Sequence, residues 1–183
     1  MFNSQLHLFT FFNTMIAQSI PDFIRTLNAL SGILEKGAAS AQARKIDPLV
    51  LTSARLAPDM FPLKKQVQIA CDVGKLGFAR LSGTEAPKFA DTESTFEELQ
   101  ARIAKTIDYL RTVTAESLAG TEDKVVSFPA GPERVLKLKG HDFLYQWMLP
   151  NLYFHTVTAY AILRHNGVDV GKMDYLKGAD LIS

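Results

Sequence analysis

Residues 143–167 read FLYQWMLPNLYFHTVTAYAILRHNG and predict a long helix near the end of the chain. We expect this helix to run from about His141 to His165, with Asn166-Gly167 closing it, because a glycine just past a helix readily takes the left-handed conformation. Most of its circumference is apolar, but the stretch is too polar for a lone membrane-spanning helix. It holds Gln146, Asn151, His155, Thr156 and Thr158. The stretch therefore predicts a helix buried on most faces inside a protein.

Apolar residues recur at steps of three and four in three earlier stretches, which is the spacing of an amphipathic helix. These are residues 16–34, with an extension towards residue 43, residues 62–82 and residues 96–110. The third stretch has a clear start, since Ser94-Thr95-Phe96-Glu97 fits the S-x-x-E capping box. Glu98 and Arg102 lie four residues apart, so we expect them to pair on the solvent side of this helix.

The segments between these helices are of two kinds. Residues 45–62 are rich in proline and enclose a short helical piece at 49–54. Residues 124–128 and 134–138 alternate in hydropathy around Pro129-Ala130-Gly131-Pro132, which predicts a β-hairpin. The sequence therefore predicts an all-α protein, an antiparallel four-helix bundle with a small β-hairpin before the last long helix.

The bundle is expected to form one domain over residues 15–175. Residues 1–14 precede it as a leader, either disordered or an arm that packs on the body, and residues 176–183 follow as a tail. The leader contains no Lys or Arg, so the positive region of a secretory signal is missing.

The composition limits the function. The chain has 183 residues, 20 Lys and Arg against 19 Asp and Glu, and a formal net charge of +1. This charge argues against nucleic acid and anionic membranes as partners bound through bulk charge. A single cysteine excludes a disulfide framework and a thiolate-rich metal site. We therefore expect a cytoplasmic protein that binds neither nucleic acid nor membrane.

A polar stripe on the last helix is the main candidate for a functional site. Asn151, His155 and Thr158 lie at positions i, i+4 and i+7, so they share one face of an otherwise apolar helix. An unsatisfied polar group in a core costs about 1 to 3 kcal/mol, so these groups need partners. His155 is a satisfied core histidine, a ligand-lining or catalytic residue, or a metal ligand. The spacing leaves all three open.

The same residues resemble a known family. Asn151-Leu152-Tyr153-Phe154-His155, followed by Tyr160 and Leu163-Arg164-His165-Asn166-Gly167, is similar to the last helix of the DinB-like superfamily of four-helix bundles. The wider sequence, including Leu56 to Leu63 and Gln66 to Ala70, resembles a branch of that superfamily known only as a domain of unknown function. This resemblance covers about Met15 to Tyr175.

The resemblance implies a modified metal site. Members of the superfamily include thiol-dependent transferases and isomerases that hold a divalent metal with three histidines, one on the second helix and two on the fourth. Here His155 remains, Asn151 replaces its partner, and the second helix offers Gln68, Cys71 or Asp72. A single histidine holds zinc or nickel poorly, so no tightly bound cofactor is expected. Asp72, Asn151 and His155 suit a weakly bound divalent cation or a small polar ligand.

Three functions follow from these patterns. The first is a bundle that binds a small polar ligand between its second and fourth helices, at Asn151, His155, Asp72, Gln68 and Tyr153, with His155 as the candidate catalytic group. The second is a non-catalytic interaction protein that forms a homodimer. The third is a metal-dependent enzyme like the thiol transferases or isomerases. An open pocket that reaches His155 favours the first, whereas a His155 sealed by Trp147 and Phe78 favours the second.

Overall fold

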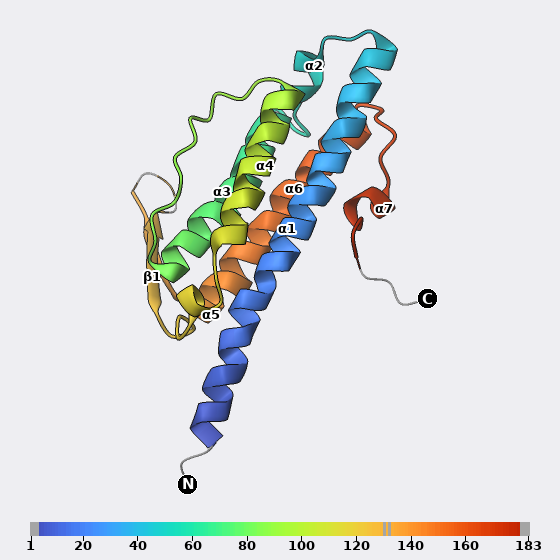
Figure 1. Ribbon diagram of the computed structural model, residues 1–183. Helices are drawn as coiled ribbons and strands as arrows, with labels where there is room; N and C mark the ends of the chain where they lie inside the picture. Colours follow the sequence, from blue (N-terminus) through green and yellow to red (C-terminus); the bar gives the residue numbers. More distant parts are fainter. Residues whose placement is uncertain (1–3, 130, 132, 180–183) are drawn as a thin grey trace.

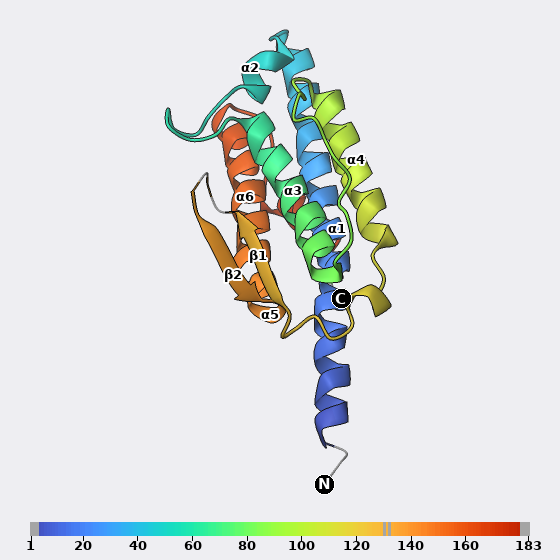
Figure 2. The same ribbon diagram turned by 90° about the vertical axis from the view of Figure 1, so that its left-hand side faces the viewer.

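The structure is a computed structural model that describes residues 4–129, 131 and 133–179, with side chains described from Met15 onward. Its long helices form a bundle (Figures 1 and 2). They are α1 (Ser4–Arg44), α3 (Leu63–Ser82), α4 (Phe96–Thr112) and α6 (Leu149–His165). The helix α3 packs against α4 and α6, and α1 closes the bundle on the side opposite α3. The predicted helical bundle is confirmed.

The helices do not all alternate in direction. An ideal Cβ on Gly37 of α1 would meet Phe96 at the start of α4, and Ser31 of α1 bonds to Gln100, so these two helices are antiparallel. By contrast, α3 and α4 run in the same direction because residues 83–95 return along the bundle before α4 begins (Figure 1). The bundle thus contains antiparallel pairs, α1 with α4 and α3 with α6, and parallel pairs, α3 with α4 and α1 with α6.

Shorter elements cap and brace the bundle. They are α2 (Pro48–Thr52), the 3₁₀ turn η1 (Glu116–Leu118), β1 (Val125–Pro129), β2 (Val135–Lys139), α5 (Gly140–Asp142) and α7 (Lys172–Tyr175). The strands pair antiparallel, with Val126 opposite Leu138 and Phe128 opposite Leu136, which confirms the predicted hairpin. Val126 and Phe128 are buried, so one face of β1 packs onto the helices while the other faces solvent.

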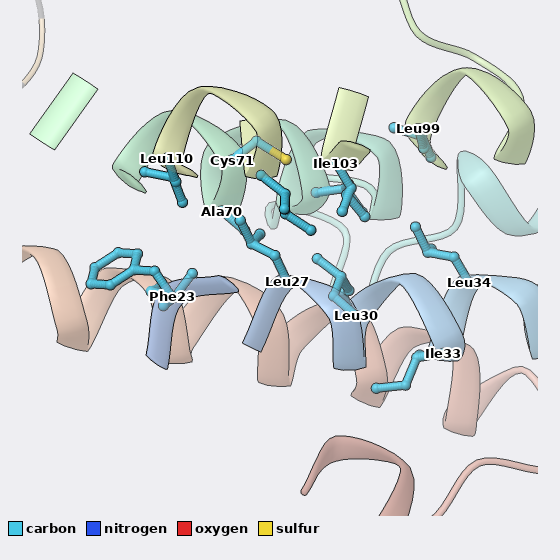
Figure 3. Packing of buried hydrophobic residues seen from close by; sticks show 14 of the residues in the cluster. Phe23, Leu27, Leu30, Ile33, Leu34, Ala70, Cys71, Leu99, Ile103 and Leu110 are labelled. Carbon is cyan, nitrogen blue, oxygen red and sulfur yellow. The ribbon is translucent and has the colours of Figure 1, made fainter. Parts of the chain in front are cut away.

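The predicted apolar stripes form the core. Side chains from α1, α3 and α4 meet at its centre (Figure 3): Phe23, Leu27, Leu30, Ala70, Cys71 and Ile103. Burial raises the pKa of the Cys71 thiol to about 12, so this cysteine is a packing residue and not a thiolate nucleophile. Within the described residues, no helix combines the length and apolar character that crossing a membrane requires.

The start of α4 differs by one residue from the prediction. Thr95 Oγ1 accepts the Glu98 N–H at 3.2 Å, and Glu98 Oε2 accepts the Thr95 N–H at 3.0 Å. The capping box therefore joins Thr95 to Glu98 and not Ser94 to Glu97. The predicted solvent-side pair of Glu98 and Arg102 is wrong, because Glu98 serves the cap and Arg102 is buried.

The last long helix is not continuous. A π-helical turn, η2 (Phe143–Met148), stands between α5 and α6. Pro150 explains why the pattern of backbone hydrogen bonds changes from α-helical to π-helical here, since it has no N–H to donate and its ring crowds the carbonyl one turn earlier. Such π-helical turns occur frequently at functional sites. This turn places Phe143, Trp147 and Met148 beside α3 and the hairpin.

Candidate functional site

His155 has a specific partner on α3. Its Nδ1 lies 2.7 Å from Oε1 of Gln66, and Nε2 of Gln66 donates to the Phe61 carbonyl at 2.9 Å. The second bond fixes the orientation of the Gln66 amide, so Oε1 is the acceptor and Nδ1 of His155 carries the proton. The imidazole therefore joins α6 to α3 as a hydrogen-bond donor.

His155 is neutral at neutral pH. It is 8% exposed, and burial lowers its pKa from 6.5 to about 4. Its neighbours on the polar stripe satisfy themselves locally, since Asn151 Nδ2 donates to the Trp147 carbonyl and Thr158 Oγ1 donates to the Phe154 carbonyl, both at 2.7 Å. These two donors of the stripe therefore find acceptors within α6 and η2.

The predicted site residues separate into three groups. Asp72 and Asn151 line the same groove between α3 and α6. Gln68 lies on the α4 side of α3, where its Nε2 donates to Glu93 at 2.9 Å. Tyr153 is 38% exposed on the outer side of α6, and neither it nor His155 lines the groove. The structure thus unites two of the five and places the others elsewhere.

The groove has a volume of about 260 Å³ and is bounded by α3, the hairpin, η2 and the first turn of α6. Aromatic rings form its wall. The ring centroid of Phe128 lies 4.8 Å from that of Phe143 and 4.9 Å from that of Trp147. A concave apolar surface with a few polar groups is the usual form of a small-molecule site.

Two residues that line the groove each have an oxygen atom without a hydrogen-bond donor among the described residues. Asp72 receives both Lys75 and Arg102 on the same atom, Oδ1, each at 2.9 Å. Among the described residues, Oδ2 of Asp72 has no donor, and the side chain is 26% exposed. The amide of Asn151 directs its Nδ2 to the Trp147 carbonyl, so its Oδ1 is also free to accept a hydrogen bond.

An ion network holds Asp72 in place. Arg102, whose side chain is 1% exposed, bridges Asp72, Asp91 and Glu93 at 2.8 to 2.9 Å. Lys65 pairs with Asp91 at 2.8 Å. Burial would raise the pKa of Glu93, but the hydrogen bond and charge of Arg102 offset burial and lower it. Lys65 and Arg102 likewise lower the pKa of Asp91 against the effect of burial, so Asp91 and Glu93 are ionised at neutral pH.

Arg80 supplies a cation at the other end of the groove. Its guanidinium carbon lies 5.8 Å from the ring centroid of Phe128. Its side chain is half-buried, and burial lowers its pKa from the ordinary value. No carboxylate lies within ion-pair distance of Arg80 in the part of the chain that the structure describes. Arg80 is therefore a charged donor without an acidic partner.

The residues present do not fit the metal site that the superfamily resemblance implies. The imidazole Nδ1 of His155 is engaged with Gln66, and the Asn151 amide is turned towards a carbonyl of its own helix. Across the described residues, no three His, Cys, Asp or Glu side chains are grouped to hold a metal ion. A transition metal needs several nitrogen or sulfur ligands, so this donor set is unsuitable.

The sequence interpretation did not identify Gln66 and Arg80 as site residues, and it considered Trp147 only as a cover for His155, whereas Trp147 packs against Phe128 at the groove. Spacing does not reveal Gln66 as the partner of His155, because the contact joins two helices 89 residues apart. Arg80 could have been found, since it lies two helical turns from Asp72 on the same face of α3. The π turn that places Trp147 at the groove has no clear sequence pattern beyond Pro150.

Comparisons with known proteins agree with this architecture. A family model described as a domain of unknown function, DUF1993, matches residues 15–176. The chain belongs to the DUF1993 family. It is also similar to the crystal structure of a DinB family member protein from Shewanella denitrificans, with 41% sequence identity and a TM-score of 0.87 over 94% of this chain and 98% of that chain. No curated protein matches the chain. This DUF1993 domain is therefore DinB-like, as its last helix indicated.

The low pKa of His155 predicts a specific acid sensitivity. Below pH 6.5 the unfolded chain protonates His155, whereas the folded chain does not until about pH 4. The free energy of unfolding should therefore fall between these values, by about 3 kcal/mol for this group when complete, and be unaffected above them. Urea unfolding at about pH 7 and about pH 4.5 measures the loss.

The variant His155→Asn is the matched control, because its amide can still donate to Gln66 but does not titrate. We expect this variant to lose less stability over the same interval than the original protein. Equal losses in the two proteins would contradict the assignment of a buried, neutral His155.

Proposed function

We propose that this protein binds a small polar ligand in the groove between α3 and α6. The observation that carries the proposal is the convergence of Asp72 and Asn151 on one cavity, each with an oxygen that no described residue occupies. The aromatic wall of Phe128 and Trp147 supplies apolar contact beside these acceptors. Such a combination fixes both the orientation and the affinity of a small molecule.

The residues have different tasks in this proposal. Asp72 and Asn151 accept hydrogen bonds from the ligand. His155 acts as a positioning residue, because its bond to Gln66 sets how α6 sits against α3 without contacting the groove. Gln68 donates a hydrogen bond to Glu93, and the side chain of Tyr153 faces outward. Neither Gln68 nor Tyr153 is therefore assigned a ligand contact.

Tight binding of a transition metal is not part of the proposed function. One imidazole engaged with an amide is a poor substitute for several nitrogen ligands. We expect tag-free protein to contain far less than one equivalent of zinc or nickel by elemental analysis. Near-stoichiometric metal that disappears in His155→Ala would overturn this part of the proposal and favour the metal-dependent transferase or isomerase alternative.

The ligand proposal can be tested with the intrinsic fluorescence of Trp147, the only tryptophan in the sequence. A metabolite library should contain compounds that change this fluorescence and raise the melting temperature. Asn151→Ala should weaken their binding by about threefold to tenfold, which is the value of one hydrogen bond.

A matched control is Asn166→Ala, since Asn166 Nδ2 also donates to a carbonyl four residues earlier, at 2.8 Å, but lies at the far end of α6. This variant should bind as the original protein does. If no compound in the library changes the fluorescence of Trp147, or if the two variants weaken binding equally, the groove is not a ligand site.

A second candidate function, homodimer formation, is favoured by His155, which is buried and does not line the groove, and by the outer face of α6. Tyr153, Phe154 and Val157 are 38%, 56% and 45% exposed there. Residues 149–163 contain no Asp, Glu, Lys or Arg, so two copies can pack these faces together without burying a charge. A twofold dimer uses the same patch on both subunits, which suits a face of uniform chemistry.

Light scattering after size-exclusion chromatography tests this alternative. We expect a dimer that Phe154→Glu converts to a monomer, because two buried carboxylates would then face each other across the twofold axis. Val125→Lys is the control, since Val125 is 63% exposed on the hairpin and lies outside this face. If the original protein and both variants are monomers, the homodimer proposal is wrong.

A further inference from the structure

The charges around the groove do not balance. The ion network beside it contains three cations and three carboxylates: Lys65, Lys75, Arg102, Asp72, Asp91 and Glu93. Arg80 lies outside this network, and no described carboxylate pairs with it. Arg80 is the only cation among the residues that line the groove, and Lys124, whose Nζ donates to the backbone carbonyls of Arg80 and Leu81, adds a second positive charge at the end where α3 meets the hairpin.

The polar groups of the groove lie at opposite ends. Arg80 and Asp72 are eight residues apart on α3, which corresponds to about 12 Å along the helix axis. Because α3 and α6 are antiparallel, Asn151 lies level with Asp72 and not with Arg80. Two contacts define this register: Gln66 bonds to His155, and Gly77 packs against Met148.

The middle of the groove is apolar. Leu76 lies one helical turn from Asp72 and one turn from Arg80, and it lines the groove between them. Phe128 and Trp147 face it from the hairpin and η2. The groove thus presents a cationic donor, an apolar middle and a pair of acceptor oxygens in that order.

We propose that the ligand is a small monocarboxylate with an apolar middle and a hydrogen-bond donor at its far end. This inference rests on the proposed function and names the ligand class of the same groove. The carboxylate pairs with Arg80, whose planar guanidinium matches it in two-point geometry. The far donor, a hydroxyl or amine, binds the oxygens of Asp72 and Asn151.

The test uses ω-hydroxyhexanoate and two analogues that each lack one feature. Hexanoate lacks the terminal donor, and the methyl ester of ω-hydroxyhexanoate lacks the anionic group. None of the three absorbs where tryptophan does, so the fluorescence of Trp147 reports binding directly. We expect ω-hydroxyhexanoate to bind at least tenfold more tightly than its ester and more tightly than hexanoate.

Variants of Arg80 test whether this residue binds the carboxylate of the ligand. Arg80→Gln should weaken ω-hydroxyhexanoate binding at least tenfold and leave ester binding unchanged. The affinity of Arg80→Lys for ω-hydroxyhexanoate should lie between those of the original protein and Arg80→Gln. Arg111→Gln is the control, because Arg111 is exposed on α4 and pairs with Asp108, away from the groove. Its binding should equal that of the original protein.

Four results would overturn the inference. Equal binding of the carboxylate and its ester, or binding that Arg80→Gln does not weaken, would show that the groove does not select an anion. If no carboxylate binds while neutral compounds from the metabolite library do, the ligand class is wrong and the proposed function stands. If nothing in either set changes the fluorescence of Trp147, both are wrong.

Discussion

The buried guanidinium of Arg102 on α4 links this helix to α3 and to the return segment that precedes α4. It joins α3 through Asp72, and the return segment of residues 83–95 through Asp91 and Glu93. Removing one partner from such a network typically costs about 3 to 5 kcal/mol, because the remaining charges stay buried and unpaired. This network holds the return segment against α3 and α4, which run parallel, and it fixes Asp72 through its Oδ1.

A second link fixes the other side of α3. The bond between Gln66 and His155 sets the register of α6, while the close approach of Met148 to Gly77 sets the position of η2. The groove lies between these two contacts, so its shape follows from helix packing and not from a mobile loop. A site built on rigid elements holds its polar groups in place before a ligand arrives.

Much of the fold could be predicted from the sequence, because apolar spacing alone specifies the helices and the hairpin. The Arg102 network could not, since its partners come from a segment whose path is set by tertiary packing. Helical spacing suggested Glu98 as the partner of Arg102, but burial and the capping box determined otherwise. For the site, helical spacing identified Asn151 and the family resemblance pointed to Asp72, whereas His155 pairs with a residue of another helix. The π-helical turn η2 arises because Pro150 cannot donate a backbone hydrogen bond, and the periodic spacing of apolar residues does not predict such a turn.

We propose that Asn151 and Trp147 line a ligand site between α3 and α6. Nuclear magnetic resonance of the side-chain N–H groups, recorded during titration with ω-hydroxyhexanoate, tests it most directly. We expect the Trp147 indole and Asn151 amide signals to move together with ligand concentration, while those of Gln68 and Asn166 stay fixed. Signals of Asn151 and Trp147 that remain unmoved while others shift would contradict it.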